Sequence, residues 1–359
     1  MNSLLSKITS PTFIILSQQL KNNIQDFKTK FESRNILFKP HFKTHQNLLI
    51  AQLMYEMGIR HITVSSLKML EFFADFQWDS ITLAFPFNFR EIEALNLLSQ
   101  QNNIHIAVEN IETVEFLKSN LLHPIGVYLK VDAGYHRTGV DFSDINLAKS
   151  ILCAINSSSR MKFKGLLAHF GNTYHAKNKD EVIDVYTHSL CNMNHLRSQL
   201  TPQFGSIPIS LGDTPSASLV EKFGDIDEFR PGNFVFFDWM QFQIGACKLE
   251  QIAAFIACPI VAKHYSRLQI IIHGGAVHFS KESLLINGNS NYGQVIIINH
   301  ELNIKVIPNC YLSSLSQEHG VVQCDEESFK RYNIGDIMTI IPIHSCLTAN
   351  LMKESTLFI

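Results

Sequence analysis

The sequence predicts an α/β protein with two parts, a barrel of eight parallel strands and a β-rich domain that follows it. From Ile36 to Gly232, short apolar runs alternate with longer segments of helical period. This alternation is typical of parallel strands joined by crossover helices. The strand–helix units number eight, which is the number that closes a (β/α)8 barrel of the TIM type. After about Gly245 the long helical period is lost and short β-type runs replace it.

Each expected strand is a short run rich in apolar residues. The eight strands span residues 36–39, 61–65, 80–85, 104–109, 126–132, 164–170, 207–211 and 228–230. Helical patterns lie between them, at residues 47–54, 89–98, 111–121, 146–155 and 182–200. A doubly wound open sheet is the alternative, but no Gly-x-Gly-x-x-Gly turn follows the first strand, so the barrel is favoured.

We assign residues 15–245 to the barrel, and residues 1–14 together with 246–359 to an antiparallel β domain. The expected strands of that domain are residues 252–261, 268–272, 294–298, 310–312, 320–324 and 337–341. A turn is expected at Asn287 and Gly288. The apolar run 11–16 could join the domain as an N-terminal strand.

The composition limits the class of protein. The chain has 359 residues, is 46% hydrophobic and carries a net charge of −2, so we expect no nucleic-acid partner. No apolar run approaches the roughly 20 residues that span a bilayer, and Met1 to Lys7 do not resemble the start of a signal peptide. The seven cysteines include no CxxC pair, and an odd count argues against a disulfide framework. A soluble cytoplasmic protein with a small-molecule ligand is expected.

Polar side chains follow several of the predicted strands at their carboxyl ends, where barrels of this type carry their chemistry. Singly, each has an ordinary structural explanation, such as a surface ion pair, a core histidine or a turn glycine. Together they fall on one predicted rim. The candidates are Lys43 after the first strand, Arg137 after the fifth, His169 and Tyr174 after the sixth, Gly212, Asp213 and Thr214 after the seventh, and Arg230, Gly232 and Asn233 after the eighth.

The turns after the seventh and eighth strands suggest a phosphate site. Barrels commonly bind phosphate there through backbone N–H groups and a short helix N-terminus. Gly212 and Gly232 would let the backbone approach an anion closely, and Thr214 adds a hydroxyl. A phosphate on one side and Lys43 on the other suggest pyridoxal 5'-phosphate (PLP), whose aldehyde condenses with a lysine amine.

The motif Lys-Pro-His-Phe-Lys-Thr-His at residues 39–45 resembles the PLP-lysine motif of the D-serine dehydratase and D-threonine aldolase family, alanine-racemase-like barrel enzymes of fold type III. The resemblance extends through residues 132–139, 168–174, 212–216 and 230–233. It implies that Lys43 holds the cofactor, that Arg137 contacts its phenolic oxygen and that His169 stacks near its ring. It also implies that the two glycine turns bind the phosphate, that Arg230 or Tyr174 faces the pyridine nitrogen, and that the protein is a homodimer.

His344 and Cys346 suggest a metal site. On a strand, residues two apart face the same side, so the two side chains could converge on one ion, and their donors favour zinc. Two protein ligands are fewer than the usual three of a catalytic zinc site, so water and substrate would complete the shell. The segment resembles the metal motif of the same family, in which cysteine marks zinc-dependent dehydratases and aspartate marks aldolases. Residues 316–320 also resemble a family segment close to the active site.

These features predict a PLP- and zinc-dependent lyase that acts on a D-3-hydroxy amino acid and forms a 2-oxo acid and ammonia. Lys43 would remove the Cα proton, and zinc would polarise the β-hydroxyl. The D-configuration is implied by the resemblance alone. The alternatives are retro-aldol cleavage to glycine and an aldehyde, racemisation, and a PLP carrier without turnover, which would have no need of the His344–Cys346 pair.

The sequence departs from the family pattern at two places. His273 occupies a position where the family resemblance leads us to expect aspartate, and residues 65–69 lack a glutamate often found after the second strand. His273 adds a titratable group. Both departures bear on the substrate more than on the cofactor.

Overall fold

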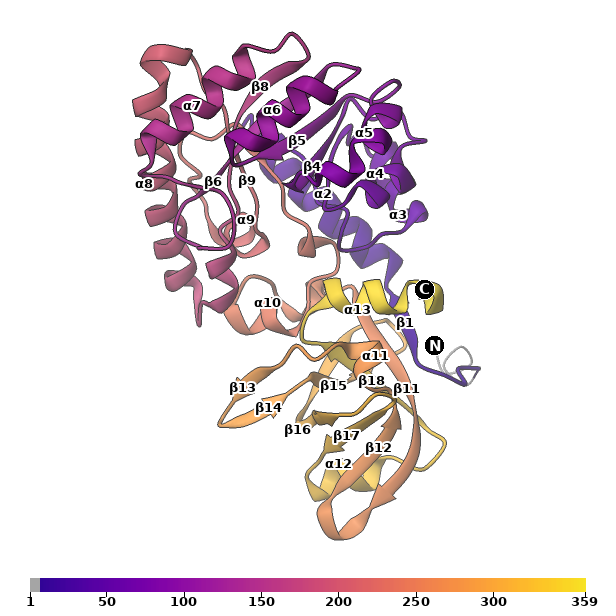
Figure 1. The fold of residues 1–359 in the computed structure, drawn as a ribbon. Coiled ribbons are helices and arrows are strands. Elements are labelled where there is room, and N and C mark those ends of the chain that lie inside the picture. Colours follow the sequence, from indigo (N-terminus) through magenta and orange to yellow (C-terminus); the bar gives the residue numbers. More distant parts are fainter. Residues whose placement is uncertain (1–6) are drawn as a thin grey trace. The chain divides into compact units, whose positions relative to one another are not determined.

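The computed structural model describes residues 7–359, and its chain divides into two compact units (Figure 1). One unit comprises Gln25–Lys43 and Leu48–Gly232, and the other comprises Met1–Ile24, Thr44–Asn47 and Asn233–Ile359. Met1 to Ser6, which belong to the predicted segment 1–14 and to the stretch inspected for a signal peptide, lie outside the described residues.

The first unit is a barrel of parallel strands, which confirms the predicted fold class. The strands follow the order β2-β10-β9-β8-β6-β5-β4-β3, and a short ninth strand, β7 (Val140–Asp141), pairs with β6. Every predicted strand is present, with bounds shifted by a few residues. The strands are β2 (Leu37–Phe38), β3 (His61–Val64), β4 (Ser80–Pro86), β5 (Ile104–Val108), β6 (Ile125–Asp132), β8 (Met161–Leu167), β9 (Ile209–Leu211) and β10 (Glu228–Phe229).

The barrel closes where the chain after β2 meets β3. Strand β2 pairs with β10 on one side. On the other side, the Phe42 N–H donates to the Thr63 carbonyl at 2.8 Å, and the Thr63 N–H donates to the Pro40 carbonyl at 2.9 Å. The Thr63 hydroxyl also donates to the Lys39 carbonyl at 2.9 Å, so the closure involves the segment that leads to Lys43.

Helices connect the strands and run along the outside of the barrel (Figure 1). They are α3 (Leu48–Glu56), α4 (Leu67–Phe73), α5 (Ile92–Leu98), α6 (Ile111–Asn120), α7 (Ile145–Asn156), α8 (Lys179–Phe204) and α9 (Thr214–Leu219). Helix α7 shows why they form: Asp144 caps its first turn by accepting from the Leu147 N–H, and Ala148, Ile151 and Leu152 are buried at helical spacing. Helix α2 (Ser17–Glu32) precedes the barrel and carries Phe31, whose ring stacks on that of Phe38.

The second unit is built on a mostly antiparallel sheet in the order β12-β17-β16-β15-β18-β11-β1-β19. Strand β1 pairs antiparallel with β11 and parallel with β19, and β12 also pairs with β11, so the sheet curls back on itself. The strands are β1 (Thr12–Ile15), β11 (Ala254–His264), β12 (Gln269–His273), β15 (Gly293–Ile298), β16 (Ile304–Leu315), β17 (His319–Gln323), β18 (Ile337–Pro342) and β19 (Thr356–Phe358).

Shorter elements complete this unit. Strands β13 (Leu284–Ile286) and β14 (Asn289–Asn291) form a hairpin around Asn287 and Gly288, as predicted. Four short helices interrupt the β structure: α10 (Trp239–Ile244), α11 (Ala276–Phe279), α12 (Glu326–Arg331) and α13 (Ser345–Met352). Within residues 7–359, no helix combines the length and the apolar character needed to cross a membrane.

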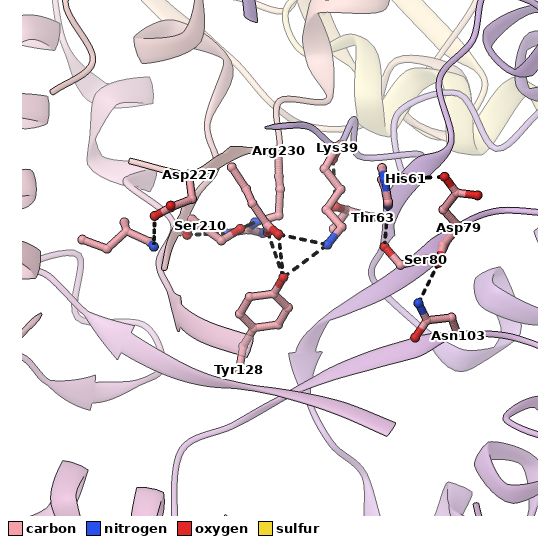
Figure 2. Close-up of polar contacts among 12 residues, drawn as sticks. Lys39, His61, Thr63, Asp79, Ser80, Asn103, Tyr128, Ser210, Asp227 and Arg230 are labelled. Carbon is pink, nitrogen blue, oxygen red and sulfur yellow. Dashed lines mark hydrogen bonds and ion pairs between the residues drawn. The ribbon is translucent and has the colours of Figure 1, made fainter. Parts of the chain in front are cut away.

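A buried charged network fills the barrel interior between β2, β6 and β10 (Figure 2). The Lys39 Nζ lies 3.2 Å from the Tyr128 hydroxyl and 3.5 Å from the Glu228 carboxylate, and the Tyr128 hydroxyl donates to Glu228 at 2.9 Å. Burial lowers the pKa of Lys39 to about 8, although Glu228 opposes this shift. Burial alone would raise the pKa of Glu228, but Lys39 and hydrogen bonds hold it below its usual value. The pair is therefore charged at neutral pH.

This network predicts how substitutions at Lys39 and Glu228 change the free energy of unfolding. Glu228→Ala should lower the free energy of unfolding by about 3–5 kcal/mol, because it leaves the buried Lys39 charge without a partner. Lys39→Met combined with Glu228→Gln should cost less, because both charges are removed and Tyr128 keeps an acceptor. Denaturant unfolding measures both values. Glu221→Ala, at a side chain that is 75% exposed, is the control and should change little. A double variant less stable than Glu228→Ala would contradict this account.

Candidate active site

Lys43 lies in the turn between β2 and α3, as the sequence predicts. The preceding side chain anchors this turn: Phe42 is fully buried, and its ring packs edge-on against those of Phe73 and Trp78, with centroids 4.9 and 5.5 Å away. The Lys43 N–H also donates to His41 Nδ1 at 3.4 Å. The backbone that carries the lysine is thus held by a packed aromatic group.

His169, just after β8, is the centre of the candidate site. Its Nδ1 bonds the Gly212 carbonyl, and its ring lies near those of Tyr135 and Tyr174, with centroids 5.9 and 6.3 Å away. Loss of water contact, together with the nearby charges of Lys43 and Arg137, holds the pKa of His169 well below its usual value. His169 is therefore a neutral aromatic ring beside two cations.

Lys130, on β6, adds a further positive charge that the sequence analysis missed. Burial first, and then the charges of Arg137 and Arg230, lower its pKa to about 8, and Lys43 contributes in the same direction. Glu109 acts in the opposite direction, and its Oε2 is buried without a hydrogen-bond partner. The signal in the sequence was a lysine near the end of an otherwise apolar strand. The site therefore holds more positive than negative charge.

The turn after β9 begins the short helix α9. Asp213 is its N-cap: Oδ1 accepts from the Ser216 N–H at 2.7 Å and from the Thr173 hydroxyl at 3.0 Å. The Thr214 N–H donates to the Tyr174 hydroxyl at 3.2 Å. A Cβ added to Gly212 would lie only 3.1 Å from the Arg230 carbonyl oxygen, so the backbones that follow β9 and β10 approach closely here.

Arg230 points back into the barrel. Its Nε donates to the Ser210 hydroxyl at 2.8 Å (Figure 2). Its Nη2 donates to the Ala168 carbonyl at 2.7 Å. Burial lowers its pKa to about 10, against the opposing charge of Glu228, so the guanidinium remains charged at neutral pH. It ties the ends of β8, β9 and β10 together.

The predicted cofactor residues are divided between the two units. Those in the barrel unit are Lys43, Arg137, His169, Tyr174, Gly212, Asp213, Thr214, Arg230 and Gly232. Asn233 belongs to the second unit, where its Nδ2 donates to Asp238 Oδ2 at 2.6 Å and to the Ser345 hydroxyl at 3.0 Å.

His344 and Cys346 do not lie on a strand, so that part of the prediction is wrong. Strand β18 ends at Pro342, His344 is the N-cap of α13, and Cys346 lies in the first turn of the helix. A contact distant in sequence stabilises this helix start: the Ser345 N–H donates to Asp238 Oδ2 at 2.9 Å. The strand periodicity used to pair the two side chains therefore does not apply.

The two side chains nevertheless interact strongly. Burial alone would lower the pKa of His344, but Cys346 and then Asp238 raise it to about 9. His344 Nδ1 lies 3.6 Å from Asp238 Oδ2. The Cys346 Sγ lies 3.1 Å from the hydroxyl of Thr44, the residue that follows Lys43 in the sequence. An imidazole, a thiol and a carboxylate that orients the imidazole form a donor set that suits zinc.

Comparison with known proteins identifies the family. Residues 15–238 match the family described as "Alanine racemase, N-terminal domain". The chain belongs to this family. Residues 253–358 match the family described as "Putative serine dehydratase domain", so the resemblance inferred from the motifs is confirmed.

Relatives align over almost the whole chain. D-serine dehydratase of Dictyostelium discoideum is 25% identical over 98% of this chain and 94% of its own. Among solved structures, D-threo-3-hydroxyaspartate dehydratase from Delftia sp. HT23 is 22% identical, with 97% and 93% of the two chains covered and a TM-score of 0.85. A mutant of that dehydratase in the metal-free form has a TM-score of 0.86. D-threonine aldolase from Filomicrobium marinum is 19% identical, with 96% and 90% covered and a TM-score of 0.83. These structures share the fold.

The Asp213 cap predicts a pH dependence of stability. Burial raises the pKa of Asp213 to about 6, above the value of about 3.9 expected in the unfolded chain. Between these values the folded protein binds a proton that the unfolded chain does not, so the carboxyl makes stability fall as pH rises from about 4 to about 6. Relative to Asp213→Asn, the free energy of unfolding of wild type should fall as pH rises through this window. Above the window, the difference between the two proteins should stay constant. Denaturant unfolding at a series of pH values measures the difference, and parallel curves throughout would contradict the raised pKa.

Proposed function

We propose that this protein is a PLP- and zinc-dependent lyase that converts a D-3-hydroxy amino acid to a 2-oxo acid and ammonia. The observation that carries the proposal is the group around His169: an amine at Lys43, a neutral aromatic ring, and surrounding cations. The dehydratases among the relatives support the choice of reaction. The homodimer and the cytoplasmic location implied by the family resemblance remain part of the proposal.

The barrel residues fit PLP, which offers an aldehyde, a flat ring and a dianionic phosphate. Lys43 supplies the amine that the aldehyde requires, and the neutral His169 supplies a ring to stack near. The excess of positive charge on Lys130, Arg137 and Arg230 over Glu109 suits an anionic ligand. The Gly212–Thr214 turn, with Asp213 as cap, would hold the phosphate together with Gly232 and Asn233.

Bound PLP would act as an electron sink that makes the substrate Cα–H acidic. Lys43, displaced by the substrate amine, would take that proton as the general base. Arg137 would face the phenolic oxygen of the cofactor, and Arg230 or Tyr174 the pyridine nitrogen. His169, whose pKa is lowered by burial and then by its cationic neighbours, keeps its ring fixed by the bond to the Gly212 carbonyl.

His344 and Cys346 would hold the zinc ion, with water and substrate completing its shell. The ion would supply Lewis acidity toward the substrate β-hydroxyl, the leaving group of a dehydration. Asp238 lies on the Nδ1 side of His344, so the imidazole is oriented to present Nε2 as a ligand. The Cys346 Sγ lies 3.1 Å from the Thr44 hydroxyl and accepts from Asn233 Nδ2 at 3.5 Å.

Retro-aldol cleavage is the second candidate. In this reaction the β-hydroxyl would give its proton to a base, its oxygen would become the carbonyl oxygen of the aldehyde, and the Cα–Cβ bond would break to leave glycine. The fold similarity to D-threonine aldolase keeps this reaction open, but the cysteine at position 346 favours dehydration. Racemisation requires only proton transfer at Cα, and a PLP carrier requires no metal, so neither accounts for the His344–Cys346 pair.

The cofactor assignment predicts that Lys43→Ala loses the visible absorbance of lysine-bound PLP and essentially all activity. The matched control is Lys68→Ala, at an exposed lysine on α4, which should keep both. Wild type should be incubated with D- and L-3-hydroxy amino acids and scored for 2-oxo acid, aldehyde, glycine and the inverted enantiomer. Formation of 2-oxo acid from D-substrates is expected. Retained absorbance in Lys43→Ala, or activity on L-substrates alone, would overturn the assignment.

The metal assignment predicts that His344→Ala and Cys346→Ser each bind one equivalent of zinc fewer than wild type and lose the dehydration. Asp238→Asn should weaken zinc binding at this site by about 10–100-fold, because the carboxylate orients a ligand. Metal analysis after equilibrium dialysis measures both effects. Full activity in protein stripped of metal would exclude this mechanism.

A further inference from the structure

We propose that His273, His278 and Glu318 form a second metal site in the second unit, for a divalent transition ion such as zinc. The proposed lyase chemistry uses none of these residues, so this site goes beyond it. One of them, His273, is a position at which the sequence departs from its family pattern.

The three side chains converge on one point. His273 Nε2 lies 3.6 Å and His278 Nε2 3.9 Å from Glu318 Oε2, and the three potential ligand atoms all lie within 4.8 Å of one another. The two imidazole rings are nearly perpendicular, with centroids 5.8 Å apart. Metal–ligand bonds of about 2.0–2.1 Å in a tetrahedral shell place ligand atoms about 3.3–3.4 Å apart. Small side-chain rotations would therefore bring the three ligand atoms within bonding distance of one ion.

The backbone already holds the three ligands together. His273 ends β12 and lies opposite His319 on β17. The Gly274 N–H donates to the Glu318 carbonyl at 2.9 Å, and the Ala276 N–H to the Ser316 carbonyl at 2.8 Å.

Gly275 makes this close approach possible. A Cβ at this position would lie 2.3 Å from the Gln317 carbonyl oxygen, so a residue with a side chain would force the two segments apart. The segments that carry the ligands are thus joined by hydrogen bonds along their length, which is the preorganisation that a metal site requires.

The donor set selects the class of ion. Two imidazoles and one carboxylate suit zinc, iron, cobalt and nickel better than magnesium or calcium. Three protein ligands with a position left for water are typical of reactive zinc sites. The side chains of His278, His273 and Glu318 are 15%, 39% and 50% exposed, so an ion and its water can reach them from solvent.

Without metal, the same groups can form an ion pair between Glu318 and a protonated histidine. The Gly275 N–H donates to His278 Nδ1 at 3.1 Å, which places the proton of a neutral His278 on Nε2. Binding of metal at Nε2 moves that proton to Nδ1 and releases the Gly275 bond. The site should therefore bind more weakly than one whose histidines are already in the ligating tautomer.

This site must be distinguished from the His344–Cys346 pair, because the elements that carry them adjoin. The Thr348 hydroxyl, on α13, donates to the Phe279 carbonyl at the end of α11 at 3.4 Å. Their donors differ, however, since only the His344–Cys346 pair contains sulfur. A thiolate bound to Co²⁺ gives a charge-transfer absorption that a site with nitrogen and oxygen ligands lacks.

The test is metal stoichiometry in PLP-loaded protein that has been stripped with chelator and titrated with Zn²⁺. Wild type should bind two equivalents per chain. His273→Ala, His278→Ala and Glu318→Gln should each lose one equivalent, or bind it at least tenfold more weakly, and keep the other. His300→Ala is the control, because this histidine is exposed in the turn after β15, and it should keep both. Circular dichroism establishes that each variant is folded.

Titration with Co²⁺ identifies which site is lost. In Glu318→Gln the thiolate charge-transfer band should remain while the second equivalent disappears, and in Cys346→Ser the reverse is expected. Equal Co²⁺ and Zn²⁺ binding by wild type, His273→Ala and Glu318→Gln would overturn the second site. If the thiolate band is absent from wild type but Glu318→Gln still loses an equivalent, the zinc assignment of the proposed lyase fails and this site stands.

Discussion

The buried pair of Lys39 and Glu228 holds the first strand of the barrel, β2, beside the last, β10. Both side chains are almost removed from water, and each neutralises the other across the seam between β2 and β10. A buried ion pair is often no more stabilising than an apolar pair, but a buried charge without its partner costs several kcal/mol. Pairing of β2 with a different strand would separate Lys39 from Glu228 and would therefore cost free energy. Lys43 lies four residues after Lys39, and Arg230 two after Glu228, so the same pair fixes the strand ends that lead to both residues.

The charges on that rim determine what the barrel can bind. Burial and mutual repulsion lower the pKa of Lys130, and the charges of Lys43 and Arg137 help to keep His169 neutral. An anionic ligand would relieve this repulsion, so it would be bound more tightly than its contacts alone suggest. The electrostatics thus favour a phosphate-bearing aromatic ligand over a cationic or neutral one.

The strands and the barrel rim could be predicted because parallel strands buried on both faces appear as apolar runs with polar residues at their ends. Lys130 was missed because it lies within such a run and only its neighbours in space reveal its role. The start of α13 could not be predicted, since it depends on Asp238, more than 100 residues away in the sequence. The cluster of His273, His278 and Glu318 depends on the register between β12 and β17, which residue patterns do not specify.

Two sets of donors in the second unit would respond differently to metal. The His344–Cys346 pair offers two protein ligands and leaves positions for a substrate. In contrast, His273, His278 and Glu318 join β12, α11 and the turn before β17. An ion bound to the three residues stabilises only the folded state, since the unfolded chain does not bring them together. By mass action this amounts to about 2.7 kcal/mol at an ion concentration 100 times the dissociation constant. The first set would thus serve chemistry, and the second would make the stability of this unit depend on the supply of metal.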